Sequence, residues 1–241
     1  FRRVLFRSGF VSLGTSGVLL AARDGYAPAP ETAIHTFCHA VPGRWYQMGV
    51  MLSATDSLNW LSKIVGTRPA DLTAPLGDEL KGPGRVRFLP YLSGERTPHN
   101  DADIRGSMTG LGTDTGLIDV TRAVLEGVAF GLRDSHEALK STGAHFDQLL
   151  AIGGGAASRY WLKLIATVLD VPLTLPRAGE FGAALGAARL GMTAAMGASV
   201  EETMEPPAAG EVVAPVPGLR AAFDEAYARF RATYPAVKAV Q

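Results

Sequence analysis

The sequence predicts a single mixed α/β domain, in which an antiparallel meander of strands comes first and β-α-β-α units follow. Three observations predict this fold class. Short extended segments separated by glycine-rich turns fill the first 50 residues. From residue 120 onward, helical and strand-like periods alternate. Hydrophobic residues make up 47% of the 241 residues, enough to bury the core of one layered domain.

The meander is expected to begin with a hairpin over residues 10–23, followed by strands at 34–38 and 45–48. Its turn is Gly14-Thr15-Ser16-Gly17, whose two glycines tolerate positive φ. A helix over residues 51–65 comes next. The evidence for that helix is an apolar stripe and a stop signal, formed by Leu52, Leu58, Leu61, Val65 and Gly66.

The sequence of the middle of the chain indicates mainly loop structure. Residues 68–84 are rich in Pro and Gly, residues 86–92 predict a strand, and residues 95–116 have neither a helical nor a strand period. The clearest helix starts near Val120, and a stripe of small residues, Ala123, Gly127 and Gly131, runs along it. Glycine inside a helix costs about 1 kcal/mol relative to alanine. The stripe therefore predicts a close approach by another backbone or by a ligand, with helix packing as the simpler interpretation.

The β-α-β-α units are expected over residues 148–190. A strand at 148–152 leads into Gly153-Gly154-Gly155, Ser158 caps a helix, and a strand at 171–175 follows. The next helix, 181–190, is predicted to turn Ala184, Leu185 and Ala188 inward. Residues 201–218 predict a Pro-rich connection. A final helix has one apolar face, formed by Leu219, Phe223, Tyr227, Phe230 and Tyr234.

Composition narrows the functional class. Lys plus Arg and Asp plus Glu both number 23, so no broad charge draws the chain to nucleic acid or to anionic lipid. The single cysteine, Cys38, builds neither a disulfide framework nor a zinc cluster, which favours a cytoplasmic setting. Among the histidines only His35 and His39 have a metal-like spacing, and that pair lies in a strand-like region, where loop or sheet positions explain it more simply. Asp101, Asp103 and Asp114 could contact Mg²⁺, but turns explain them more simply.

Two glycine-rich segments are candidate phosphate or nucleotide sites. In Gly14-Thr15-Ser16-Gly17, backbone N–H groups and two hydroxyls are available as donors, although an ordinary hairpin turn is an alternative. Gly153 to Ser158 lies between a strand and a helix, where phosphates bind readily, although a tight structural turn is again an alternative. The dinucleotide-binding fingerprint requires a third glycine where Ser158 stands and an acidic residue at the end of the next strand, where the sequence is Leu175-Pro176-Arg177. The sequence therefore fails both requirements for NAD, and only Arg177 leaves an NADP-binding variant open.

The order of the motifs resembles the FGGY family of carbohydrate kinases. Its second signature is similar to Gly106-x-Met108-x-Gly110-Leu111, seven further residues, and Asp119-Val120-x-x-Ala123-Val124-Leu125-Glu126. Leu13 to Gly17 resembles its second phosphate motif, and Gly153 to Ala156 resembles its adenosine motif. Glu180 with Ala184 to Ala188 resembles its closing nucleotide-side helix. Three further stretches, 37–40, 51–54 and 88–99, most resemble members that act on xylulose.

The resemblance implies an actin-like, ribonuclease-H-like ATPase fold and an ATP site. It implies that Gly14, Thr15 and Ser16 contact the β- and γ-phosphates. Thr55 and Asn59 match nucleotide-contacting positions, Gly154, Gly155 and Ala156 admit the adenosine, and Arg159 matches an adenine contact. Mg²⁺ is then held mainly by ATP oxygens and water, with no metal ligand assigned in this chain.

The resemblance also implies what this chain leaves to other residues. In the family an aspartate before the phosphate hairpin is the catalytic base, so we expect that base upstream of residue 9 and assign no catalytic residue here. Most contacts to a ketose or polyol would come from an N-terminal domain. The fragment alone is then expected to be inactive. A homodimer is one assembly open to the full-length enzyme, and the sequence does not fix the oligomeric state.

The expected organisation has three parts. Residues 1–8 are basic and apolar and are interpreted either as a non-native segment or as a native strand. Residues 9–200 form the nucleotide-binding domain, and residues 201–241 form a connection and a helix packed on it. Phosphorylation of D-xylulose to D-xylulose 5-phosphate is the expected reaction. The alternatives are a family member acting on ribulose, fuculose, rhamnulose, gluconate or glycerol, and a nucleotide-binding module without chemistry.

Overall fold

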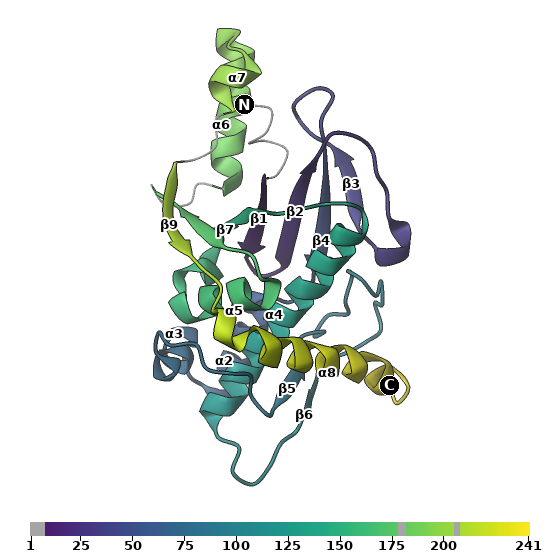
Figure 1. Cartoon of the computed structure of the whole chain (residues 1–241), viewed down its shortest axis with the longest axis vertical. Coiled ribbons are helices and arrows are strands. Elements are labelled where there is room, and N and C mark those ends of the chain that lie inside the picture. The colour runs from purple at the N-terminus through teal and green to yellow at the C-terminus, as the bar shows by residue number, and fades with distance from the viewer. Residues whose placement is uncertain (1–7, 178–181, 205–207) are drawn as a thin grey trace.

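The computed structural model describes residues 8–177, 182–204 and 208–241 and confirms the mixed α/β fold (Figure 1). Seven strands form one sheet in the order β3-β4-β2-β1-β7-β8-β9. In chain order they are β1 (Ser8–Leu13), β2 (Gly17–Arg23), β3 (His35–Cys38), β4 (Trp45–Met51), β7 (Gln148–Ile152), β8 (Leu173–Pro176) and β9 (Ala209–Val213).

The sheet combines an antiparallel meander with a parallel centre. β2 pairs antiparallel with β1 and β4, and β3 pairs antiparallel with β4. β1 pairs in parallel with β7, and β7 with β8, while β9 returns antiparallel at the edge. The parallel pairs place the ends of β1 and β7 side by side, because Ser12 is in register with Ile152. Both glycine-rich turns start at these two strand ends.

The helices are α2 (Thr55–Val65), α3 (Pro69–Thr73), α4 (Leu117–Ser141), α5 (Arg159–Leu169), α6 (Gly182–Met196), α7 (Val200–Thr203) and α8 (Arg220–Lys238). α4 packs on β2 and β4 with one part and on α5 with another, so nearly all its side chains from Ala123 to Ser135 are buried. α8 crosses over α4 and α5 (Figure 1). Among the described helices, none combines the length and apolar character needed to cross a membrane.

The glycine stripe of α4 is a packing device. A second, two-stranded sheet, β5 (Arg87–Leu89) with β6 (Ser107–Thr109), lies against this helix. A Cβ added to Gly127 would overlap the carbonyl oxygen of Phe88 and lie 3.2 Å from its carbonyl carbon. At Gly131 the nearest atom to an added Cβ would be the terminal Cε of Met51, at 3.1 Å. The stripe is therefore a packing feature, in which Gly127 admits the backbone of strand β5 and Gly131 admits the side chain of Met51 from β4.

Several predicted element boundaries were wrong. The helix predicted from residue 51 begins at Thr55, because Met51 still pairs with Gly17 as the last residue of β4. The predicted loop 68–84 contains α3, which starts with Pro69 at its first turn. The predicted strand 86–92 is only the three residues of β5, and the turn-rich stretch contains β6. The Pro-rich connection contains α7 and β9.

The inward face predicted for the helix after β8 was also wrong. Ala184 and Ala188 are exposed, and α6 has no buried residue in the described chain. α6 packs against α7 and stands beyond the ends of the strands (Figure 1), not on a face of the sheet. Glu180 lies outside the described residues, as do residues 1–7 and 205–207, whereas Ser8 belongs to β1.

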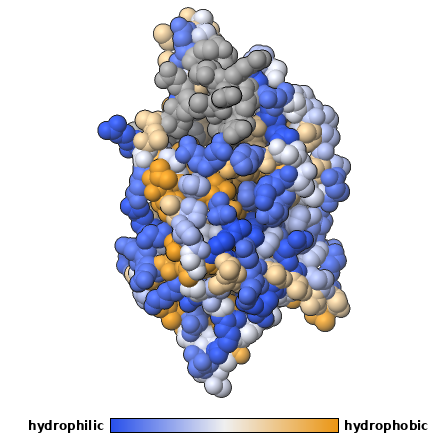
Figure 2. All heavy atoms as spheres, viewed as in Figure 1, coloured by the Kyte–Doolittle hydropathy of each residue, from blue (hydrophilic) through white to orange (hydrophobic). Residues whose placement is uncertain are grey.

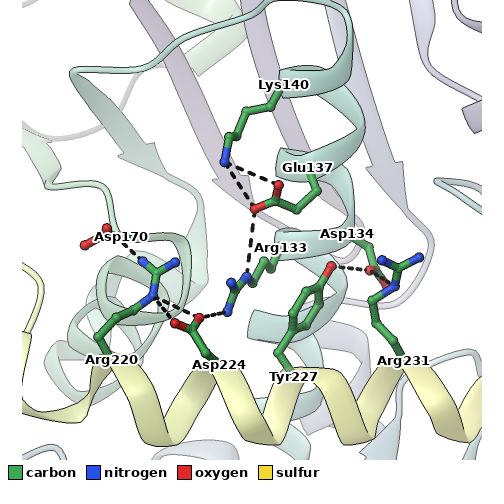
Figure 3. Close-up of polar contacts among 9 residues, drawn as sticks. All are labelled: Arg133, Asp134, Glu137, Lys140, Asp170, Arg220, Asp224, Tyr227 and Arg231. Carbon is green, nitrogen blue, oxygen red and sulfur yellow. Dashed lines mark hydrogen bonds and ion pairs between the residues drawn. The ribbon is translucent and has the colours of Figure 1, made fainter.

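Charged side chains join α8 to α4 (Figure 3). Arg133 contacts Asp224 with a nitrogen–oxygen distance of 2.6 Å. The hydroxyl of Tyr227 donates to Asp134 at 2.6 Å. Burial raises the pKa of Asp134 to about 6, although the Tyr227 hydroxyl and the nearby Arg231 and Arg133 act in the opposite direction. This network, together with the apolar face of Phe223, Tyr227 and Phe230, fixes α8 on the domain.

The surface is mainly hydrophilic on the face drawn in Figure 2. Apolar side chains gather on one flank of this face, over the region of β8, β9 and α5 seen in Figure 1.

Candidate functional site

The first part of the candidate site is the turn that joins β1 to β2. Leu13 and Gly17 are the last paired residues, which leaves Gly14, Thr15 and Ser16 to form the turn. Thr15 and Ser16 are exposed, while Leu13 and Gly17 on either side are buried. The buried ends anchor the turn, so an exposed backbone is presented by a rigid support.

The start of α2 fixes the direction of this turn. Thr55 donates to the carbonyl oxygen of Gly14 through its N–H at 3.0 Å and through its Oγ1 at 2.8 Å. The N–H of Ala54 donates to the carbonyl oxygen of Thr15 at 2.8 Å. In a trans peptide the N–H points opposite to the carbonyl of the same unit. The N–H groups of Thr15 and Ser16 therefore point away from α2, and neither has a partner among the described residues.

The second glycine-rich turn, Gly153 to Ala157, packs directly on the first. Gly153 has a φ of 93°, and a Cβ on it would lie 2.6 Å from the carbonyl carbon of Leu13. A Cβ on Gly155 would lie 2.8 Å from the Cβ of Leu13 and 3.1 Å from the Cγ2 of Thr55. Only glycine allows this approach at positions 153 and 155. Gly154 is different, since a Cβ there would meet nothing within 4 Å and the residue is exposed.

The remaining predicted residues lie at the edge of this junction. The N–H of Trp161 donates to Ser158 Oγ at 3.3 Å, which confirms the predicted cap at the start of α5. Arg159, the first residue of α5, is exposed and pairs with Glu211 of β9. Asn59 is exposed one helical turn after Thr55 on α2. The structure thus joins Gly14, Thr15, Thr55 and Gly155 by direct contact, with Asn59 and Arg159 at the periphery.

Sequence reasoning missed two contributors to this junction. The N–H of Asp56 lies 3.4 Å from the carbonyl oxygen of Thr15 and adds a fourth hydrogen bond between the start of α2 and the turn. Glu211 forms an ion pair with the Arg159 guanidinium. Glu211 lies on β9, a strand that was not predicted because the segment around it is rich in proline. The one local signal for that strand is the β-branched pair Val212-Val213.

The junction is an open surface with hydrogen-bond donors. A hollow of about 180 Å³ lies elsewhere, between β5 and the start of α4, and is lined by Arg85, Asp114, Asp119 and Arg122. Within the described residues, no group of three or more His, Cys, Asp or Glu side chains is placed to hold a metal ion. Backbone N–H groups and hydroxyls with an exposed glycine suit an anion such as a phosphate chain.

The model of the FGGY family of carbohydrate kinases, C-terminal domain, matches residues 9–195. The chain belongs to the FGGY family. The match covers the hairpin turn, the start of α2 and the second glycine-rich turn, so every part of the junction lies inside it.

Comparison with individual proteins also finds carbohydrate kinases. The xylulose kinase of Escherichia coli (strain K12) is 45% identical over 188 residues, which are 77% of this chain and 38% of that protein. A crystal structure of a "xyloylose kinase" from Brucella ovis is 55% identical with a TM-score of 0.94 and covers 98% of this chain and 49% of that one. The xylulose kinase of Rhodospirillum rubrum superposes with a TM-score of 0.83 at 26% identity, covering 98% of this chain and 48% of that one.

The FGGY chain spans about two fifths of the length of the curated relatives it matches and about half of the matched structures. Its structural neighbours are sugar kinases of the actin-like ATPase fold, which confirms the fold expected from the motifs.

Proposed function

We propose that this chain is the nucleotide-binding, C-terminal part of an ATP-dependent kinase that phosphorylates D-xylulose to D-xylulose 5-phosphate. The observation that carries the proposal is the junction of the Gly14–Ser16 turn, the start of α2 and the Gly153–Ala157 turn. The identity of 45% to a xylulose kinase favours xylulose over other sugars. Residues 9–200 are the nucleotide-binding domain in this proposal, and residues 201–241 complete it.

The donor set of the junction fits an ATP molecule. Gly14, Thr15 and Ser16 would hold the β- and γ-phosphates, because the outward N–H groups and two hydroxyls are suited to anionic oxygens. Thr55 would contribute through its position against Gly14. Gly154, Gly155 and Ala156 would lie under the adenosine, where the open space over Gly154 leaves room for it.

Asn59 and Arg159 would border the adenine from the two helices. The Arg159 guanidinium is planar and can stack on a base, and its pairing with Glu211 would hold its plane in place. Mg²⁺ would be bound mainly by ATP oxygens and water, because the chemistry of the junction is that of anion donors. Bound ATP supplies the phosphoryl group. The residues of this chain bind and orient it, while the catalytic base and most sugar contacts belong to residues upstream of residue 9.

Two experiments test the proposal. Calorimetric titration of the chain with ATP, ADP and NADPH should give binding of both adenosine phosphates and none of NADPH. A kinase assay on the full-length protein, with xylulose, ribulose, fuculose, rhamnulose, gluconate and glycerol, should give the highest kcat/KM for xylulose. Binding of NADPH without adenosine phosphates would overturn the nucleotide assignment. A higher kcat/KM for another sugar would overturn the substrate.

A further inference from the structure

The segment Glu95 to Thr97 completes β4 where β3 ends. β3 pairs with β4 only as far as His35 opposite Met48. Beyond that point the N–H of Thr97 donates to the carbonyl oxygen of Val50 at 3.0 Å. The N–H of Val50 in turn donates to Thr97 Oγ1 at 3.0 Å. A loop therefore provides the bonds that an edge strand would otherwise form.

The carboxyl group of Glu95 extends this pairing by one more step. Its Oε1 accepts from the N–H of Leu52 at 3.2 Å and from the N–H of Arg96 at 2.7 Å. The residue is 2% exposed, and its Oε2 is buried without a partner among the described residues. An unpaired buried carboxyl oxygen destabilises the folded state, so accepting one backbone N–H from Leu52 does not by itself explain an acid at this position.

Leu52 connects this carboxyl group to the phosphate turn. Only Ser53 separates Leu52 from Ala54, whose N–H donates to the Thr15 carbonyl oxygen. Thr55 follows with its two bonds to Gly14. A shift of Leu52 would therefore be transmitted directly to the carbonyl groups that orient the outward N–H groups of the turn.

Glu95 is itself held from the far side of the domain. Its backbone exchanges two hydrogen bonds with Asp101, each 2.8 Å long. The Asp101 carboxylate accepts from Tyr234 Oη at 2.8 Å and from Lys238 Nζ at 2.7 Å, both on α8. The loop is thus anchored at one end by α8 and acts on the β4–α2 connection at the other.

We propose that Glu95 is a positioning residue, whose carboxyl group holds Leu52 so that the Gly14–Ser16 turn presents its N–H groups to the phosphates of the nucleotide. The inference rests on the proposed function, because it assumes that the turn binds phosphate. It predicts that Glu95 governs phosphate recognition without affecting recognition of the adenosine portion.

The test compares two substitutions at position 95. Glu95→Met fills the same space without an acceptor, and Glu95→Gln keeps an acceptor for Leu52. Affinities of the chain for ATP and for adenosine are measured by calorimetry. Glu95→Met should weaken ATP binding about tenfold, the effect of losing one or two phosphate hydrogen bonds, and should change adenosine binding less than twofold. Glu95→Gln should restore most of the ATP affinity.

Glu126→Met is the matched control. Glu126 is also a buried carboxyl that accepts a backbone N–H, here from Gly84 at 3.0 Å, and it lies on α4 away from the turn. The control should lower the melting temperature while leaving the ratio of ATP to adenosine affinity unchanged. If Glu95→Met does not fold, Thr97→Val, which removes the acceptor for Val50, should show the same selective loss to a smaller degree.

The outcomes separate the inference from the function on which it rests. A wild-type chain that binds no adenine nucleotide overturns both. A wild-type chain that binds ATP, with a Glu95→Met variant that loses ATP and adenosine affinity equally or not at all, overturns the positioning role alone.

Discussion

Alanine at Gly127 should destabilise the domain and alanine at Gly131 should not, although both glycines lie on one stripe of α4. Each substitution gains about 1 kcal/mol of helix propensity. At Gly127 the new Cβ overlaps the backbone oxygen of Phe88, which cannot move without shifting β5. Overpacking against such an atom costs about 3 kcal/mol. The net expectation for Gly127→Ala is a loss of about 2 kcal/mol.

At Gly131 the neighbour is the flexible end of Met51, 3.1 Å from the new Cβ. A shift of a few tenths of an ångström relieves this contact, because methionine adapts easily. Gly131→Ala should therefore be neutral or stabilising by about 0.5 kcal/mol.

The assay for both variants is urea unfolding followed by circular dichroism, with melting temperatures alongside. Gly127→Ala should lower the melting temperature by about 5 °C, and Gly131→Ala should leave it unchanged or raise it slightly. Equal losses in the two variants, or a Gly127→Ala variant as stable as the wild type, would refute the packing argument.

Two further predictions concern buried carboxyl groups. Burial raises the pKa of Glu95 to about 8, with Asp134 adding to the rise and Arg96 opposing it. The folded chain then holds a proton that the unfolded chain releases from about pH 4.5 upward, so the stability of the wild type falls as pH rises toward 8. Glu95→Gln has no such proton, so its free energy of unfolding should rise relative to that of the wild type by about 1.4 kcal/mol per pH unit between pH 5 and 7.5. A difference that does not change with pH would contradict the raised pKa. Tyr227→Phe should cost about 2 kcal/mol in urea unfolding at pH 7, because it removes a donor to buried Asp134, and a loss below about 0.5 kcal/mol would mean that the bond is dispensable.

Local signals were sufficient for much of the site. The glycines that flank Thr15 and Ser16 predicted the hairpin, and Ser158 predicted the start of α5, because turns and caps depend on the residues that form them. The order of the motifs predicted the family and the fold. What the sequence could not reveal is that Gly155 packs against Leu13 and Thr55, a contact set by the parallel pairing of β1 with β7.

Features that depend on distant contacts escaped prediction. β9 has little strand character of its own and exists because β8 offers it an edge. The prediction that α6 has an inward face was wrong, because an apolar pattern does not reveal whether another element covers that face. Glu95 lies in a stretch without any period, and its role depends on Leu52, which is 43 residues away.

We propose above that the Gly14–Ser16 turn, the start of α2 and the Gly153–Ala157 turn form one adenine-nucleotide site. Titrating an isotope-labelled chain with ADP and following its backbone amide resonances tests this most directly. The largest shifts are expected at Thr15, Ser16, Thr55, Gly154 and Gly155. Saturable shifts confined to other residues, such as those lining the hollow at Arg85 and Arg122, would contradict it.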